Sequence, residues 1–414
     1  MGELFESEQM KERVILVGVQ TQGQDDVFWS LLELEELAQT AGAEVVARIV
    51  QNREGIHPAT YVGKGKIEEI RQMLYMVEAT GIICDDELSP AQLNNLEREL
   101  ECKVMDRTLL ILDIFAGRAT TSEGKIQVEL AQLKYRQARL VGLRSSLSRL
   151  GGGIGTRGPG EKKLEMDRRL ITDRIAALRR ELEEVQRHRD LIRQKREKGR
   201  MKVCAIVGYT NAGKSTLLNV MTGAGVLEED QLFATLDPTT RVLDLPGGQQ
   251  ILLTDTVGFI RKLPHHLIEA FKSTLEEARY ADIILHVVDS SSPQMEQQMQ
   301  VVYDTLKQLE VEERTVITLF NKQDKMTEEK QLRDSRADYV LKTSVKYHEG
   351  LESLRELLEE ILRKQQIFID RIYPYQEASK ISLIRQYGQL ISEEYLPEGI
   401  KVQAYVPKEI YGNV

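Results

Sequence analysis

The stretch that decides the fold runs from Lys202 to Thr222 and reads KVCAIVGYTNAGKSTLLNVMT. Its opening, KVCAIVG, is an apolar run typical of a buried strand, and its end has the composition and spacing of a helix. Between them, Gly208 to Ser215 match the pattern G-x-x-x-x-G-K-[ST]. The glycines let successive backbone N–H groups turn towards a phosphate chain at the start of the helix. The stretch therefore predicts a strand, a phosphate-binding loop and a helix.

Each position of this loop has an expected part in binding a nucleotide. Lys214 is expected to bridge the β- and γ-phosphates, and the Ser215 hydroxyl is expected to bind Mg²⁺. The rest of the loop is expected to line the phosphates: Gly208, Tyr209, Thr210, Asn211, Ala212 and Gly213.

The base is expected to bind further along, at Asn321-Lys322-Gln323-Asp324, directly after the strand-like run RTVITLF. The Asp324 carboxylate can accept hydrogen bonds from N1 and N2 of guanine, whereas adenine would leave it unpaired. The motif therefore predicts GTP rather than ATP. Asn321 is expected to tie the base loop to the phosphate loop, and the Lys322 stem to pack along the base. The strand-like run DYVLK is followed by a segment whose backbone N–H groups are expected to reach the guanine O6. The residues of this segment are Ser344, Val345 and Lys346.

Two segments between these motifs are expected to sense the γ-phosphate. In LLTDTVGFI, Asp255 ends a strand and can hold Mg²⁺ through water, while the N–H of Gly258 can contact the γ-phosphate. The predicted loop FATLDPTT carries Thr235, Thr239 and Thr240, any of which could supply a second Mg²⁺ ligand, and we assign Thr235. The nucleotide-contacting residues of the two segments are then Phe233, Ala234, Thr235, Leu236, Asp237, Asp255, Thr256, Val257 and Gly258. Lys214, Thr235 and Gly258 are the expected catalytic residues, and Ser215, Thr235 and Asp255 the expected Mg²⁺ ligands.

Composition and length narrow the class of protein. A chain of 414 residues is expected to form two to four domains. Its 41% apolar and 29% charged residues are ordinary for a globular protein, and no apolar run approaches the roughly 18 residues of a membrane span. The polar start predicts no secretory signal and a cytosolic protein. The cysteines, Cys84, Cys102 and Cys204, lie singly in apolar runs, which predicts buried thiols and no zinc site.

Charge is distributed unevenly along the chain. The net charge is -9, yet residues 134–202 hold about 21 Lys and Arg against about 9 Asp and Glu. This basic stretch contains two predicted helices, 125–148 and 161–198, joined by the glycine-rich loop 151–160, GGGIGTRGPG. A solvated helical spacer is one interpretation. Cations around the glycines favour contact with RNA phosphates instead: Arg149, Arg157, Lys162 and Lys163.

The chain divides into four predicted domains of an α/β protein. Residues 1–120 alternate strand and helix patterns and predict a small parallel α/β domain, in which Ser89, Pro90 and Gln92 mark a capped helix start. Residues 121–200 form the helical hairpin arm. Residues 201–364 form the domain with the nucleotide motifs, and residues 365–414 a small strand-helix-strand appendage.

The motifs together resemble one family. The order GxxxxGKS, FATLD, DTVG, NKQD and TSVK resembles the translation-factor-related GTPases and, more closely, the HflX family. Further strings also resemble that family: TYVGKGK (60–66), DDELSPAQ (85–92), DRTLLILDIFAGRA (106–119) and GGGIGTRGPGEKKLE (151–165). The resemblance implies GTP hydrolysis stimulated on the large ribosomal subunit and separation of stalled ribosomes, notably under stress. It also implies that the basic arm reaches ribosomal RNA, and we expect a monomer.

Two other functions stay open from the sequence. Gly63-Lys64-Gly65-Lys66 could give the amino-terminal domain a phosphate-handling role in RNA remodelling, or could be an ordinary basic turn into a helix. A signalling switch that binds only proteins would leave the basic arm unexplained. Phe259 follows the DTVG motif where many GTPases place a glutamine, and an apolar ring cannot orient the attacking water. We therefore expect slow hydrolysis that a partner accelerates.

Overall fold

The structure of the chain is a computed structural model that describes residues 11–22, 26–150, 159–199, 201–223, 232–233, 236–264, 277–311, 314–326, 331–364, 366–407 and 410–414. The side chains of 141–150, 159–164, 190 and 192–199 are not described. The chain forms two compact units. The first contains residues up to His188, together with the described parts of 229–237 and 260–273. The second contains the described remainder, from Arg189 onwards.

The first unit is built on a four-stranded parallel sheet with the strand order β2-β1-β3-β4, as the alternating pattern predicts. Its strands are β1 (Arg13–Gln20), β2 (Glu44–Asn52), β3 (Gly81–Cys84) and β4 (Lys103–Asp106). Its helices are α1 (Val27–Thr40), α2 (Lys64–Met76), α3 (Pro90–Leu100) and α4 (Arg107–Arg118). The strand order reverses between β1 and β3. Sheets of this kind bind ligands outside the carboxyl ends of their strands at such a point.

The start of α3 confirms the predicted cap. The Ser89 hydroxyl accepts from the N–H of Gln92, and the Gln92 side chain accepts from the N–H of Ser89, with Pro90 in the first turn. Leu88 and Leu96 are buried in the core that the sheet shares with α2 and α3. The local sequence therefore fixes where this helix begins.

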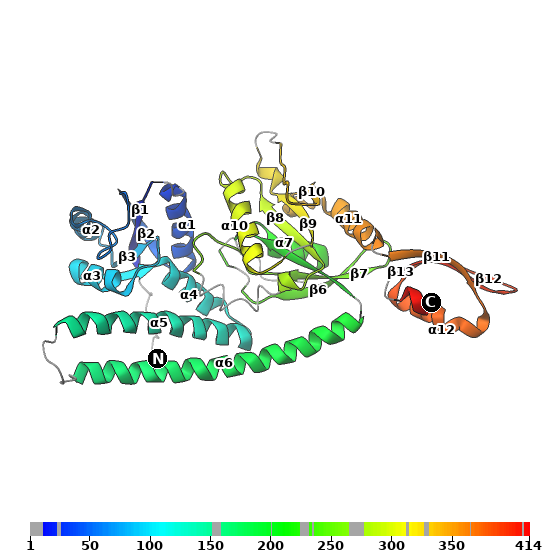
Figure 1. The fold of residues 1–414 in the computed structure, drawn as a ribbon. Coiled ribbons are helices and arrows are strands. Elements are labelled where there is room, and N and C mark those ends of the chain that lie inside the picture. Colours follow the sequence, from blue (N-terminus) through cyan, green and yellow to red (C-terminus); the bar gives the residue numbers. More distant parts are fainter. Residues whose placement is uncertain are drawn as a thin grey trace, which may run out of the picture. The chain divides into compact units, whose positions relative to one another are not determined.

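The arm consists of α5 (Ser122–Leu150) and α6 (Pro159–Gly199), two long helices that lie alongside each other (Figure 1). Leu130, Ile175 and Leu178 form their shared core, and Arg174 pairs with Glu129 at 2.7 Å. The predicted loop 151–160 was too long, because Pro159 and Gly160 already belong to α6, and proline suits the first turn of a helix. Its remaining residues, 151–158, lie outside the described residues.

The second unit holds a six-stranded sheet with the order β10-β9-β8-β5-β7-β6, parallel except for the edge strand β6. Its strands are β5 (Lys202–Gly208), β6 (Thr239–Asp244), β7 (Gln250–Asp255), β8 (Ile283–Asp289), β9 (Thr315–Asn321) and β10 (Tyr339–Lys342). Its helices are α7 (Lys214–Thr222), α10 (Met295–Gln308) and α11 (Leu351–Lys364), with short 3₁₀ turns η1 (Gln323–Lys325) and η2 (Val345–Tyr347).

The predicted loop FATLDPTT ends earlier than expected. Thr239 and Thr240 are the first residues of β6 and pair with Asp255 and Thr254 of β7. The hydroxyls of Thr240 and Thr254 lie 3.0 Å apart. Threonine is β-branched and suits a strand, so these two candidates for a Mg²⁺ ligand belong to an edge strand.

The end of the chain forms a small antiparallel sheet with the order β11-β13-β12. Its elements are β11 (Gln366–Tyr373), η3 (Tyr375–Glu377), α12 (Ala378–Tyr387), β12 (Gln389–Leu396), β13 (Gly399–Pro407) and η4 (Tyr411–Asn413). The predicted strand-helix-strand is thus extended by β12. The Glu359 carboxylate of α11 accepts from the N–H of Gly247 at 3.0 Å, and the Gln389 side chain donates to Glu359 and to the Gly247 carbonyl.

Among the described residues, no helix combines the length and the apolar character needed to cross a membrane. Cys84 and Cys204 are buried as predicted, whereas Cys102 lies just before β4 and is only half-buried, so that part of the prediction was wrong. Burial raises the pKa of Cys84 well above its ordinary value and that of Cys102 to about 11. These thiols are therefore protonated at neutral pH.

Candidate nucleotide-binding site

The predicted phosphate loop lies between β5 and α7 and depends on close backbone approaches. Gly213 has a φ of +99°, and a Cβ there would stand 2.4 Å from the Asn321 side chain. A Cβ at Gly208 would stand 2.3 Å from the Val287 carbonyl oxygen of β8. Only glycine suits either position without displacement of the neighbouring strand or loop. The two glycines of the pattern are therefore required by geometry.

Two polar side chains of the loop make contacts within the second unit. The Lys214 ammonium donates to the Tyr209 carbonyl at 2.7 Å and is 6% exposed. Burial lowers the pKa of Lys214 to about 8, against the opposing effect of Asp255. The Ser215 hydroxyl donates to the Asp255 carboxylate at 2.7 Å. Lys214, Ser215 and Asp255 thus converge on one place.

The segment after Asp255 is joined to the same loop. The N–H of Thr210 donates to the Phe259 carbonyl at 2.8 Å, and the N–H of Phe259 donates to the Gly208 carbonyl at 3.1 Å. A Cβ at Gly258 would meet the Thr210 Cα at 2.9 Å and the Lys214 nitrogen at 3.0 Å. The Phe259 side chain is buried, with 2% exposure. Gly258 can therefore approach the loop only because it lacks a side chain.

Thr256 and Val257 support this approach. The Thr256 hydroxyl donates to the Ile206 carbonyl of β5 at 2.7 Å, and both residues are buried. The Thr256 hydroxyl therefore holds the turn against β5.

The predicted base loop is connected to the phosphate loop by one side chain. The Asn321 amide donates to the Ala212 carbonyl at 2.9 Å and accepts from the N–H of Val345 at 3.0 Å. The Ser344 hydroxyl donates to the Asp324 carboxylate at 2.5 Å. Asn321 therefore ties together three motifs that lie far apart in the sequence.

Two contacts of the base loop were missed in the sequence. The Lys322 ammonium pairs with Asp289 at 2.8 Å, and the Gln323 amide donates to the Ser290 hydroxyl at 2.8 Å. Asp289 ends β8 beside Asn321 of β9. A carboxylate at the end of a buried strand, in the run VVDSSS, was the available signal.

The described residues of the FATLD segment belong to the first unit. Phe233, Leu236 and Asp237 are buried or half-buried in the first unit, and Ala234 and Thr235 lie outside the described residues. The Phe233 ring packs edge-on against Phe115 of α4, with centroids 4.7 Å apart. The assignment of Thr235 stays a prediction.

The cradle has features that suit a nucleotide. The Thr210 hydroxyl is buried and has no hydrogen-bond partner among the described residues. A Cβ at Gly213 would stand 2.4 Å from the Asn321 side chain, and one at Gly258 would stand 2.8 Å from the Thr210 side chain, so the backbone approaches its neighbours closely at both positions. Ser215 and Asp255 are oxygen donors, which Mg²⁺ prefers, usually together with water and substrate phosphates. No group of three His, Cys, Asp or Glu within the described part of the chain could hold a metal by itself.

The basic turn of the amino-terminal domain resembles an ordinary helix start. Gly63 precedes the first residue of α2, and its N–H donates to the Gln51 side chain at 2.8 Å. Lys66 pairs with Glu69 one turn along the helix at 2.6 Å. These contacts favour the structural interpretation of this turn.

The chain matches known families along most of its length. Residues 29–116 match the family described as GTP-binding GTPase N-terminal, and residues 118–196 match GTP-binding GTPase Middle Region. Residues 203–322 match the family described as 50S ribosome-binding GTPase.

Individual relatives agree with these matches. GTPase HflX of Lacrimispora saccharolytica is 66% identical over 414 residues, covering 100% of this chain and 98% of that protein. GTPase HflX of Caldanaerobacter subterraneus is 51% identical, covering 97% and 92%. GTPase HflX of Escherichia coli is 46% identical, covering 78% and 75%. A crystal structure of a GTP-binding protein from Sulfolobus solfataricus with GDP is 25% identical and covers 84% of this chain and 98% of that chain, at a TM-score of 0.45. Family matches cover the amino-terminal region, the middle region and the nucleotide motifs, and relatives match the chain over its whole length. The chain therefore belongs to the HflX family of GTPases.

Proposed function

We propose that this GTPase binds the large ribosomal subunit in a nucleotide-dependent way and separates stalled ribosomes into subunits, under stress. The match of residues 203–322 to ribosome-binding GTPases supports the partner. The basic stretch 134–202 on an otherwise acidic chain supports a contact with ribosomal RNA. The working protein is then a cytoplasmic monomer that associates with ribosomes, and its four domains follow the boundaries predicted from the sequence.

The observation that carries the nucleotide part of the proposal is the Asn321 side chain. It joins the loop that carries Gly213 and Lys214 to the loop that carries Asp324 and to the N–H of Val345. These hydrogen bonds join the loop that we propose holds the phosphates to the loop that we propose reads the base. That arrangement suits a guanine nucleotide, because only guanine offers Asp324 two donors.

The residues have the following roles in this proposal. Backbone groups of Gly208 to Gly213 surround the phosphates, and Lys214 neutralises the charge on the β- and γ-phosphates. Asp324 reads the base, while Asn321 and Lys322 shape its loop and Ser344, Val345 and Lys346 close over its edge. Gly258 and Thr235 report the presence of the γ-phosphate. Lys214, Thr235 and Gly258 are the residues that contact the reacting phosphate.

Mg²⁺ fits this site, and Ser215, Asp255 and Thr235 would hold it. The ion supplies neutralisation of the phosphate oxygens. The present pairing of Ser215 with Asp255 keeps both oxygen groups together at the end of β7. GTP and GDP are then the substrate and product that switch the protein.

Hydrolysis by the free protein is expected to be slow. The residue after Gly258 is Phe259, whose buried ring offers no group that can orient water. A partner that supplies or positions such a group would accelerate the reaction. Single-turnover assays with and without large ribosomal subunits test this, and equal rates would refute it.

The proposal as a whole is tested by sedimentation with ribosomal subunits under GDP, GTP and a non-hydrolysable analogue, at two salt concentrations. Lys214→Ala is expected to remove GTP binding and nucleotide-dependent sedimentation together. Lys364→Ala, an exposed lysine paired with Glu360, is the matched control and is expected to sediment like the wild type. Association that ignores nucleotide, or that survives Lys214→Ala in every nucleotide state, would contradict the coupling. Association without salt dependence would favour a protein-only switch.

A further inference from the structure

The predicted base loop lies beside a turn that the nucleotide motifs do not include. Asp289 is the last residue of β8 and pairs with Asn321, the last residue of β9. Since these two strands are parallel, the segments that follow them leave the same edge of the sheet. One segment carries Lys322 and Asp324, and the other consists of residues 289–291, which we call the Asp289 turn.

The backbone of the base loop is held in part by the Asp289 turn. The N–H of Ser290 donates to the Asn321 carbonyl at 3.0 Å, and the Ser290 hydroxyl accepts from the Gln323 amide at 2.8 Å. Ser290 is only 4% exposed. The N–H of Gln323 donates to the Thr343 carbonyl, beyond β10, at 3.2 Å. The base loop is therefore held from two neighbouring segments.

The side chain of Lys322 is held by Asp289. One carboxylate oxygen of Asp289 lies 2.8 Å from the Lys322 ammonium. The other accepts from the N–H and the hydroxyl of Ser291, at 3.0 and 2.6 Å. The side chains of Asp289 and Lys322 are 20% and 18% exposed. Because Ser291 fixes one oxygen of the carboxylate, the other presents a fixed acceptor to the lysine.

Both ends of the Lys322 side chain are thereby ordered. Its backbone is left-handed, with a φ of +61°, a conformation that residues other than glycine rarely adopt. Its ammonium is paired with Asp289. A free lysine side chain samples many rotamers, and its ordering by a ligand costs entropy. Here the carboxylate orders the stem before a ligand arrives, which is how preorganisation raises affinity.

The same carboxylate acts on the charge of the site. Burial is the main cause of the lowered pKa of Lys214, Asp255 opposes it, and the Lys322 charge adds to the lowering. The two ammonium groups therefore act on one another. An anionic phosphate chain would attract an unpaired Lys322 ammonium, whereas Asp289 attracts it towards the end of β8.

We propose that Asp289 is a positioning residue for the guanine base, because it holds the Lys322 ammonium so that the lysine stem lies ready along the face of the base. This inference rests on the proposed function, in which Asp324 reads the hydrogen-bonding edge of the base. Asp289 acts on the face of the base, through Lys322. Loss of Asp289 should therefore weaken binding without changing which base is preferred.

The test is a double-mutant cycle on the full chain, measured by equilibrium binding of a fluorescent GDP. Asp289→Asn leaves one acceptor oxygen for the two donors, Ser291 and Lys322. Lys322→Met keeps an apolar stem but removes the ammonium. Asp289→Asn is expected to weaken GDP binding about tenfold in the wild type and less than about twofold in the Lys322→Met background, because the group through which it acts is absent there.

Asp282→Asn is the matched control at the other end of β8. Asp282 immediately precedes that strand and accepts from the Lys202 ammonium at 2.9 Å and from the N–H of Val203 at 3.0 Å. The control thus also removes a carboxylate that pairs with a lysine and a backbone N–H. It should bind GDP like the wild type.

The preference for the base gives a readout that separates positioning from a general structural role. Inosine diphosphate lacks the guanine 2-amine, so the GDP-to-IDP affinity ratio reports recognition by Asp324. This ratio is expected to keep its wild-type value in Asp289→Asn, whereas a loosened base loop would lower it. The loss of affinity should also be the same for GDP and for a non-hydrolysable GTP analogue, because the lysine stem acts on the base.

Four results would overturn the inference. These are wild-type affinity in Asp289→Asn, an equal loss in the Lys322→Met background, an equal loss in Asp282→Asn, and a lowered GDP-to-IDP ratio in Asp289→Asn. A loss confined to the GTP analogue would also overturn it, since Lys322 would then act on the phosphates. A wild-type protein that bound no guanine nucleotide would instead overturn the proposed function.

Discussion

The six-stranded sheet of the second unit and the four-stranded sheet of the first both carry an aspartate at the carboxyl end of an interior strand. In the second unit, Asp255 meets Lys214 and Ser215 beside glycines at which a Cβ would collide with its surroundings. In the first unit, Asp85 meets the large side chains of Arg107 and Lys262. At the end of β7 a lysine stands beside glycines, whereas at the end of β3 two long cations contact the aspartate.

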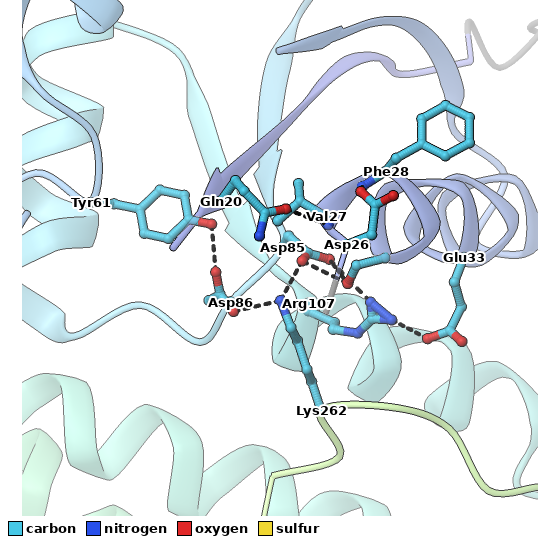
Figure 2. A network of polar contacts seen from close by, with 11 residues as sticks. Gln20, Asp26, Val27, Phe28, Glu33, Tyr61, Asp85, Asp86, Arg107 and Lys262 are labelled. Carbon is cyan, nitrogen blue, oxygen red and sulfur yellow. Dashed lines mark hydrogen bonds and ion pairs between the residues drawn. The ribbon is translucent and has the colours of Figure 1, made fainter. Parts of the chain in front are cut away.

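The difference shows how one architecture can serve two purposes. Glycines keep backbone N–H groups accessible for a phosphate ligand. At the corresponding end of a strand in the first unit, the long side chains of Arg107 and Lys262 pair with the carboxylate of Asp85 (Figure 2). These ion pairs join parts of the protein to one another. We infer that the fold alone does not select between these outcomes, and that the side chains at the ends of the strands do.

The largest expected effect comes from breaking the charge cluster of Asp85, Arg107 and Lys262. Asp85→Ala leaves Arg107 buried with one carboxylate fewer, and is expected to cost about 3–5 kcal/mol in the free energy of unfolding of the first unit. The measurement is denaturant unfolding, monitored by hydrogen exchange of the amides in β1 and β3. Glu44→Ala, which removes an exposed partner of Arg13, should cost less than about 0.5 kcal/mol. Equal costs in the two variants would show that the cluster does not stabilise the unit.

A smaller effect is expected from changing Asp324, the carboxylate that we propose reads the base in the second unit. Asp324→Asn replaces a carboxylate oxygen, which accepts hydrogen bonds, with an amide N–H, which donates one. The change should weaken GTP binding about 100-fold. It should also allow xanthosine triphosphate to bind, because xanthine has a carbonyl in place of the guanine amine and can accept from the new N–H. Competition binding with the two nucleotides measures this. Asp304→Asn, on the exposed face of α10, is the control and should leave both affinities unchanged. An Asp324→Asn protein that kept full preference for GTP would exclude this residue from base recognition.

The glycine surface of the second unit can be tested by filling it. Gly258→Ala places a methyl group against the Thr210 backbone and is expected to cost about 1–3 kcal/mol in stability and to remove the GTP-specific response. Thermal melts with GDP and with a GTP analogue report both effects. Gly65→Ala, in α2, meets no atom within 4 Å and should behave like the wild type. If Gly258→Ala kept a larger analogue-induced than GDP-induced shift in melting temperature, the role of Gly258 would be wrong.

The smallest effect concerns pH. The pKa of Lys214 is lowered to about 8 by burial, and a bound phosphate favours the charged form and raises that pKa. GTP affinity should therefore be constant below pH 8 and fall as pH rises above it, with proton uptake on binding. Calorimetry in two buffers of different ionisation enthalpy, at pH 7.2 and 8.6, measures the uptake. Equal uptake at both values would contradict the lowered pKa.

The sequence predicted what local patterns encode. The alternating patterns predicted both parallel sheets, and Ser89 and Gln92 predicted the start of α3. The strand β12 was missed because the apolar residues of its run QLISEEYL do not alternate with polar ones, and none of its residues is buried. The contacts of Asp237 with Thr120 and of Lys262 with Asp85 join residues 117 and 177 positions apart, and no local pattern encodes them. The domain boundaries and the assignment of Thr235 remain predictions.

The most direct test of the account is a displacement experiment with a fluorescent guanine nucleotide bound to the wild-type protein. We predict that GTP and GDP displace the probe, because the loops that carry Lys214, Asn321 and Asp324 are joined. ATP should not displace it even at about a 100-fold excess, which is roughly the discrimination that a mismatched hydrogen-bonding edge provides. Displacement by ATP at the same concentrations as GTP would contradict the account.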